Sequence, residues 1–249
     1  MALIWHESRD GVAYEVRSHG RTLRLYANGI QHSEYNPSRL VTGSVWDLLW
    51  LPVLFDDPTR YRRVLVLGLG GGSLVPPLKA LASPEVIIAV EKDPLHLAVA
   101  RDHFGVARDG VQCHCADAVD FVEAYDGPPF DLVIEDLFAP HDRTVSRAVP
   151  ASGRWLGKLS RLVADDGMLV MNFGDWAEYR NSRITGRRSM RGWKQRYRFA
   201  TRDCHNAVIV FRRTVASSAG LREQIQARDE LSWHLGTGLL NYTVRKLDG

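Results

Sequence analysis

The sequence predicts a doubly wound α/β fold, in which helices cover both faces of a mainly parallel sheet. The first observation behind this prediction is an apolar strand at residues 64–67 that runs straight into four glycines among five positions: Gly68, Gly70, Gly71 and Gly72. Such a turn brings bare backbone amides close to a ligand, and the helix that follows adds the positive end of its dipole. The second observation is that acids close the later apolar strands of the same segment.

The remaining elements follow in order along the chain. Residues 14–34 are predicted to form a β-hairpin, and the apolar run 45–55, interrupted by Asp47 and Pro52, a buried helix that leads into the glycine-loop strand. Residues 73–83 form the helix after the glycines, 86–93 the second strand and 130–136 the fourth strand. We expect a small β-unit over 1–45, the doubly wound domain over 46–215 and a helical tail over 216–249.

In that tail, Ser217 and Ser218 are candidate helix caps, and Leu221, Ile225 and Leu231 can share one face.

Three acids indicate that the domain binds a nucleoside. Glu91 stands 23 residues after Gly68, about where a βαβ unit holds the two hydroxyls of a ribose. Asp117 follows a third predicted strand, and Asp136 closes the fourth. The carboxyl ends of parallel strands lie along one edge of a sheet, so these acids are expected to converge on one crevice. The loop departs from the dinucleotide fingerprint at Ser73, which disfavours a nicotinamide-dependent oxidoreductase.

The glycine spacing after a strand resembles motif I of class I S-adenosylmethionine-dependent transferases. From about residue 12 to 213, the chain further resembles the spermidine synthase (polyamine aminopropyltransferase) family. LRLYANGIQHSE is similar to that family's LVLDGVIQxTE segment, with Gln31, Ser33 and Glu34 at matching places. ADAVDF is similar to its GDGxxF adenine segment, and FDLVIEDLFAP to its FDVIxxDSSDP segment.

This resemblance implies a Rossmann-like class I methyltransferase fold with a small N-terminal β-hairpin unit. It implies S-adenosylmethionine or its decarboxylated form as cofactor, and Asp136 as the catalytic residue that accepts a proton from the attacking amine. It also implies a homodimer with contacts through the β-unit and the tail. The residues expected to bind the cofactor are Gln31, Gly68, Gly70, Gly71, Gly72, Glu91, Asp117 and Ala118.

The chain departs from the family at the positions that recognise a polyamine. Gly71 stands where the family has an aspartate for the aminopropyl ammonium, Ala139 replaces the second aspartate of DSSDP, and TRDCHNAV at 201–208 replaces PTYPSG. An ion pair at ~4 Å is worth up to ~4 kcal/mol at an effective dielectric near ~20, so its absence disfavours the decarboxylated donor. We also expect the glycine amides to be free to hold a donor carboxylate.

Methyl transfer to an unidentified nucleophile is therefore favoured. Aminopropyl transfer is the alternative, and a non-catalytic nucleoside-binding protein is a further one.

Composition is that of a globular enzyme, with 249 residues and a net charge of +3. The sequence has no long apolar run, and we expect a cytoplasmic protein without a membrane segment. The partner we expect is a small-molecule acceptor. Cys113 and Cys115 flank His114 but are expected to be core thiols, with no metal site.

Residues 180–198 hold eight Lys or Arg and no acid, with Trp193 and Tyr197 among them. A solvated insertion is favoured there, and a lid over an acidic substrate or a nucleic-acid patch in which the aromatics stack on bases remains open.

Overall fold

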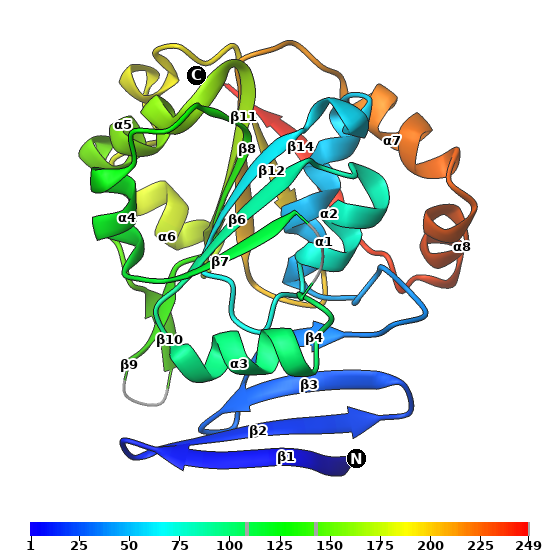
Figure 1. The fold of residues 1–249 in the computed structure, drawn as a ribbon. Helices are drawn as coiled ribbons and strands as arrows, with labels where there is room; N and C mark the ends of the chain where they lie inside the picture. Colours follow the sequence, from blue (N-terminus) through cyan, green and yellow to red (C-terminus); the bar gives the residue numbers. More distant parts are fainter. Residues whose placement is uncertain (108–109, 142–143, 249) are drawn as a thin grey trace.

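The computed structural model describes residues 1–107, 110–141 and 144–248 and confirms the doubly wound α/β fold (Figure 1). Its main sheet has the order β14-β12-β13-β11-β8-β5-β6-β7. The parallel part comprises β5 (Arg63–Leu67), β6 (Val86–Glu91), β7 (Val111–Cys115), β8 (Phe130–Glu135) and β11 (Val163–Phe173). Next to β11 lie three antiparallel strands: β13 (Ala207–Arg212), β12 (Gln195–Ala200) and β14 (Thr243–Leu247).

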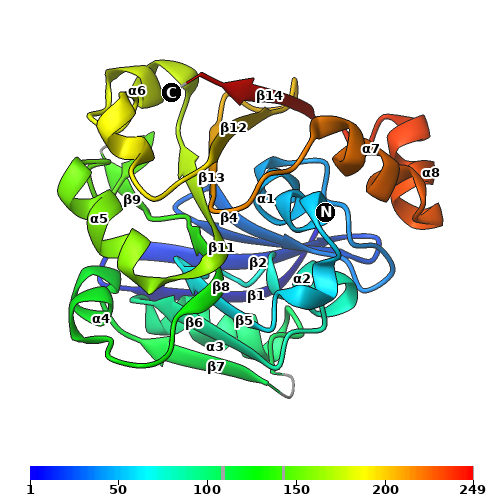
Figure 2. The ribbon, with the colours of Figure 1, turned by 90° about the horizontal axis from the view of Figure 1, so that it is seen from above.

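Two hydrophobic clusters lie on the two faces of this sheet. Alternate residues of β5 separate between them, with Val64 and Val66 in one cluster and Leu65 and Leu67 in the other. The first face is covered by α1 (Val45–Trp50), α2 (Val75–Leu81), α3 (Pro94–Asp102), α7 (Ser218–Gln226) and α8 (Asp229–Thr237). The second is covered by α4 (Ala118–Ala124), α5 (Gly153–Leu162) and α6 (Trp176–Asn181), as the view from above shows (Figure 2).

The N-terminal unit is a four-stranded antiparallel sheet of order β1-β2-β3-β4 rather than the single predicted hairpin. Its strands are β1 (Ala2–Arg9), β2 (Val12–His19), β3 (Thr22–Ala27) and β4 (Ile30–Tyr35). The segment LRLYANGIQHSE within the predicted hairpin is itself a hairpin of β3 and β4, with a turn at Asn28 and Gly29, whose φ angles are 49° and 78°. Asn-Gly is the strongest short signal for such a turn, so the sequence contained this information.

The helices largely follow the predictions. The apolar run 45–55 forms α1 and then the 3₁₀ helix η1 (Leu51–Phe55), every residue of which is buried. Ser217 caps α7 by accepting a hydrogen bond from the amide of Gly220, and Leu221, Ile225 and Leu231 are buried. The tail is not purely helical, however, because β14 pairs with β12 and becomes an edge strand of the main sheet.

The expectation of two core thiols is wrong for Cys115, which is exposed, while Cys113 is half-buried. Both lie on β7, an edge strand of the main sheet, and this explains their exposure.

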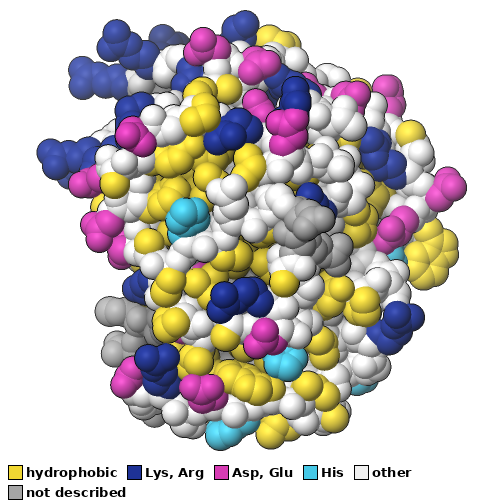
Figure 3. Space-filling model, viewed as in Figure 1, with side chains coloured by type: hydrophobic (Ala, Val, Ile, Leu, Met, Phe, Trp, Pro, Cys, Tyr) yellow, Lys and Arg dark blue, Asp and Glu magenta, His cyan; other side chains and the backbone are white. Residues whose placement is uncertain are grey.

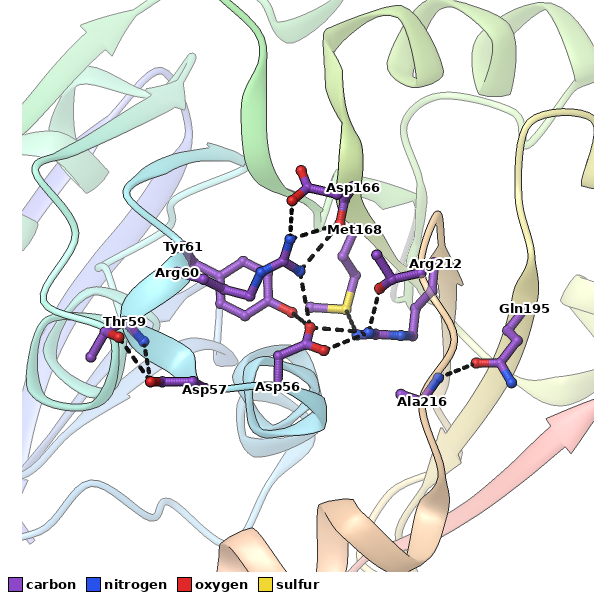
Figure 4. A network of polar contacts seen from close by, with 11 residues as sticks. Asp56, Asp57, Thr59, Arg60, Tyr61, Asp166, Met168, Gln195, Arg212 and Ala216 are labelled. Carbon is purple, nitrogen blue, oxygen red and sulfur yellow. Dashed lines mark hydrogen bonds and ion pairs between the residues drawn. The ribbon is translucent and has the colours of Figure 1, made fainter.

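A polar network anchors the segment that leads into β5, around the 3₁₀ helix η2 (Pro58–Arg60) (Figure 4). The guanidinium of Arg212, only 1% exposed, lies 3.0 Å from each oxygen of Asp56. Asp56 also accepts hydrogen bonds from the hydroxyl of Tyr61 at 2.6 Å and from Arg60 at 3.1 Å. Burial opposes ionisation of Asp56, but Tyr61 and Arg212 outweigh it and lower the pKa of this carboxyl. The network therefore fixes the start of β5 to the antiparallel part of the sheet.

Among the residues that the structure describes, none of the helices has the length and apolar character needed to cross a bilayer.

Candidate functional site

A cavity of about 430 Å³ lies between the N-terminal sheet and the carboxyl ends of the parallel strands. Doubly wound sheets bind their ligands at this edge. The cavity has a polar region beside β6 and α4 and a second region beside β8, β11 and the hairpin of β9 (Phe138–His141) and β10 (Thr144–Arg147). Its lining includes Gln31, His32, Gly68, Gly70, Glu91, Asp117, Ala118, Asp136, Phe138, Ala139, Asn172 and Asn206. The three predicted acids thus meet at one site.

Two of the predicted glycines form part of the cavity wall. Gly68 has a φ of +85°, and a Cβ atom there would lie 2.2 Å from the backbone oxygen of Asp136. Only glycine fits this close approach of the loop to the end of β8. The amide of Gly70 donates a 2.8 Å hydrogen bond to the carboxylate of Glu91. The loop is therefore fixed to the ends of both neighbouring strands.

Gly71 and Gly72 are not among the residues that line the cavity, and their role in cofactor binding stays a prediction. The amide of Gly71 donates to Oγ of Ser33 at 2.6 Å, and a Cβ atom on Gly71 would lie 2.8 Å from Cβ of Ser33. The amide of Gly72 donates to the carbonyl of Leu69 at 2.9 Å. The loop amides at Gly70, Gly71 and Gly72 are thus engaged within the protein and not free for a donor carboxylate. Sequence reasoning missed this because it depends on how β4 packs against the loop.

Glu34, a further residue of the resembling N-terminal segment, also holds the loop in place. Glu34 is buried and ion-paired with Arg24 at 2.7 Å and with Arg39 at 3.0 Å. Its backbone amide donates to Oγ of Ser73 at 2.9 Å. Of Gln31, Ser33 and Glu34, only Gln31 lines the cavity.

The polar region has the geometry expected of a nucleoside site. The two oxygens of Glu91 accept backbone hydrogen bonds, among them one from Gly70 at 2.8 Å and one from Asp93 at 2.9 Å, and a carboxylate has about four acceptor positions in all, so room remains for a ribose hydroxyl. Burial raises the pKa of Glu91. Asp117 caps α4 by accepting from the amide of Val119 at 2.7 Å through one oxygen. Its other oxygen remains available to an amino group.

Asp136 lies in the second region, directly after β8, and its carboxylate is held by two amides in series. Nδ2 of Asn172 donates to Oδ1 of Asp136 at 2.8 Å, and Nδ2 of Asn206 donates to Oδ1 of Asn172 at 3.1 Å. Burial raises the pKa of Asp136 to about 6, against the stabilising hydrogen bond from Asn172. The group is therefore largely ionised at neutral pH and far more basic than an ordinary aspartate. A carboxylate of this kind is suited to accept a proton.

The adjacent carboxylate, Glu135, is fully buried and paired with Arg147. The two guanidinium nitrogens of Arg147 lie 2.6 and 2.9 Å from the two oxygens of Glu135, a bidentate arrangement. Arg147 also donates to the backbone oxygen of Asn172 and lies over the ring of Phe173. The pair attaches the β9–β10 hairpin to the ends of β8 and β11, and leaves Asp136 as the carboxylate that faces the cavity in the second region.

Sequence reasoning missed Asn172, Asn206, Arg147 and two histidines. His32 and His96 contact each other with ring centroids 5.0 Å apart at the cavity wall. Burial and the neighbouring His96 lower the pKa of His32 to about 4, and burial also lowers the pKa of His96. A polar residue close to the end of an apolar run, as Asn172 is in LVMNF, was a usable signal. The other residues needed the strand register.

The residues present fit an adenosyl sulfonium donor. The cavity volume lies in the range of about 300–1,000 Å³ typical of small-molecule sites. Glu91 and Asp117 offer acceptor oxygens to a ribose and an adenine amino group, and Asp136 places negative charge in the second region, where a sulfonium would lie. Near the loop, the bulk of Ser33 occupies the space into which a side chain at Gly71 would project.

The basic segment lies away from the cavity. Six of its cationic side chains are exposed: Arg180, Arg183, Arg187, Arg188, Arg191 and Lys194. Figure 3 shows Lys and Arg gathered at the upper left, where Figure 1 places α5 and the residues after α6. Trp193 and Tyr197 are only 6% and 2% exposed, so they are not available to stack on bases, which corrects that part of the nucleic-acid alternative. Contact of these exposed cationic side chains with nucleic acid stays an open alternative, and the sequence favours a solvated insertion.

Comparison of the sequence with known proteins finds no matching family model. The chain is 32% identical over 117 residues to the eEF1A lysine and N-terminal methyltransferase of Mus musculus, a match over 44% of this chain and 17% of that protein. It is 30% identical over 119 residues to the protein of the same name from Homo sapiens, with the same two shares covered. The chain thus matches about a sixth of the length of these relatives.

Comparison of the structure finds a likeness to both transferase types. A probable spermidine synthase from Corynebacterium glutamicum ATCC 13032 superposes with a TM-score of 0.72 at 14% identity, covering 99% of this chain and 92% of that one. Human methyltransferase-like protein 13, solved in complex with SAH, gives a TM-score of 0.59 at 21% identity, covering 76% of this chain and 92% of that one. The chain therefore has the Rossmann-like fold shared by S-adenosylmethionine-dependent methyltransferases and spermidine synthases.

Proposed function

We propose that this chain binds S-adenosylmethionine in the cavity and transfers its methyl group to an amine acceptor. The main support for the proposal is that, in the second region of the cavity, Asp136 presents one basic carboxylate beside Asn172. A single carboxylate suits an acceptor with one reacting nitrogen. The names of the relatives, which are methyltransferases of lysine and of an N-terminus, support an amine as the acceptor.

In this mechanism Glu91 holds the ribose and Asp117 the adenine, and the walls of the cavity exclude water from the reacting atoms. When bound, the donor supplies an electrophilic methyl carbon on a sulfonium that leaves as a neutral thioether. The lone pair of the acceptor nitrogen forms the new carbon–nitrogen bond while the carbon–sulfur bond breaks. Oδ2 of Asp136, which the amide of Asn172 does not occupy, accepts the proton that the nitrogen gives up.

Aminopropyl transfer is the second candidate, favoured by the likeness to a probable spermidine synthase over 99% of this chain, N-terminal sheet included. Against it stand Gly71, whose Cβ direction points into Ser33 rather than into the cavity, and Ala139. Neither position is acidic. The chain therefore lacks both of the carboxylates that the spermidine synthase family pairs with the cationic tail of the donor and with the polyamine. A nucleoside-binding protein without catalysis is the third candidate. The homodimer and a cytoplasmic location stay predictions.

The test of the proposal is calorimetric titration with S-adenosylmethionine, S-adenosylhomocysteine, decarboxylated S-adenosylmethionine and NADH. We expect the first two to bind and to raise the melting temperature by mass action, and NADH not to bind. A preference of about tenfold or more, or about 1.4 kcal/mol, for the decarboxylated donor would favour aminopropyl transfer instead. If no adenosyl sulfur compound binds, the cavity is not a donor site.

A further inference from the structure

Three neighbouring strands bring one polar side chain each to the same end of the main sheet. Register pairs Met171 of β11 with Glu135 of β8, so the next residues, Asn172 and Asp136, are adjacent. On the other side, Asn172 pairs with Val208 of β13, so Asn206, two residues before Val208, lies diagonally across from Asn172 on the same face. The result is a row in which Asn206 donates to Asn172 and Asn172 donates to Asp136.

The hydrogen bonds in this row run in one direction, from Asn206 to Asn172 and from Asn172 to Asp136. A carboxamide has a donor end and an acceptor end of nearly the same shape, so the side chain of Asn172 fits its site either way round. An ionised Asp136 needs the donor end of Asn172, whereas a protonated Asp136 can donate to its acceptor end. Because Nδ2 of Asn206 occupies Oδ1 of Asn172 at 3.1 Å, the acceptor end is turned away from Asp136.

The backbone around the row is fixed as well. Arg147 donates to the backbone oxygen of Asn172, and Asn172 itself is only 2% exposed. Asn206 is half-buried and lines the cavity without reaching Asp136 directly. It belongs to the 201–208 segment, which differs from the polyamine-binding segment of spermidine synthases. This segment therefore retains a side chain that contributes to the site through a neighbour.

We propose that Asn206 is a positioning residue that, by orienting the amide of Asn172, keeps Asp136 ionised with its Oδ2 directed to the acceptor. The inference rests on the proposed function, because the value of an ionised Asp136 lies in accepting the acceptor's proton. It predicts that loss of the Asn206 donor makes Asp136 harder to ionise, although the two side chains do not touch.

The experiment measures the pKa of Asp136 by ¹³C NMR in protein labelled at the aspartate carboxyl carbons, with the signal assigned by its loss in Asp136→Asn. Asn206→Leu keeps the size of the side chain and removes the donor. We expect the pH midpoint to rise by about 0.5–1, the equivalent of one neutral hydrogen bond. Asn206→Gln, which restores a carboxamide, should recover part of the change, and Asn181→Ala, at an exposed position, serves as the control.

A double-mutant cycle separates action through Asn172 from a general effect of an apolar side chain. In an Asn172→Ala background, Asn206→Leu should leave the midpoint unchanged. An equal rise in both backgrounds, or no rise in either, would overturn the inference. If Asn206→Leu does not fold, Asn206→Ser is measured in the same two backgrounds. The measurement needs neither donor nor acceptor, so its result is independent of the proposed function. If the pH midpoint of Asp136 rises as expected but the protein transfers no methyl group, only the proposed function is refuted. If the protein transfers a methyl group but the midpoint does not rise, only this inference is refuted.

Discussion

Replacing Asp136 with asparagine is expected to stabilise the protein while removing its activity. Burial raises the pKa of this carboxyl from its ordinary value of 3.8 to about 6, so the folded protein binds the proton more tightly than the unfolded chain does. Stability is therefore lost as the pH rises from about 4 to about 6, and the loss persists at higher pH. The difference corresponds to about 3 kcal/mol at ~1.4 kcal/mol for each tenfold change in proton affinity.

The Asp136→Asn side chain would keep a polar contact with Asn172 without a buried charge. At pH 8 we expect the variant to gain up to about 3 kcal/mol, or about 5–10 °C in melting temperature, and at pH 4 to gain little. Donor affinity should stay within a few-fold, and turnover should fall by about 10²–10⁴, the usual contribution of a general base. Thermal denaturation at the two pH values, calorimetry and kinetics on one preparation test this. A melting temperature at pH 8 equal to or below that of the wild type would refute the reasoning, and unchanged turnover would remove Asp136 from the mechanism.

Three further changes test other parts of the site. Glu91→Ala should weaken S-adenosylhomocysteine binding by about 1.5–3 kcal/mol in calorimetry, because charge-assisted bonds to the ribose are lost, and unchanged affinity would contradict this role. Gly71→Ala should lower the free energy of unfolding by about 1–3 kcal/mol in a denaturant titration, because its Cβ atom would lie 2.8 Å from Cβ of Ser33. For the same reason, Gly71→Asp should not create a preference for the decarboxylated donor. Arg147→Met leaves Glu135 buried without its partner and should cost about 3–5 kcal/mol, most of which Arg147→Met with Glu135→Gln should recover.

The positions that sequence alone located share one property. Gly68, Glu91 and Asp136 follow or close short apolar strands, and Asp117 follows the less apolar strand β7. The carboxyl ends of parallel strands lie along one edge wherever such strands form one sheet. The crossover order of the strands was therefore enough to bring them together.

The residues that sequence reasoning missed depend on packing between distant segments. Gly71 faces Ser33 because β4 lies against the loop, and Asn206 reaches Asn172 only through the antiparallel register of β11 and β13. The strand β14 has a mostly exposed pattern as an edge strand, so it lacks the apolar run that identified β5 and β8.

The most direct test of the central claim is the identity of the adenosyl product. The wild-type protein is supplied with S-adenosylmethionine and its decarboxylated form at equal concentration, together with putrescine and lysine-containing peptides, and the products are quantified by mass spectrometry. Asp136→Asn is the matched control. Methyl transfer predicts S-adenosylhomocysteine and a methylated amine in the wild type, and at least about a hundredfold less of both in the variant. Methylthioadenosine and spermidine as the main products would contradict the account and assign aminopropyl transfer to the site.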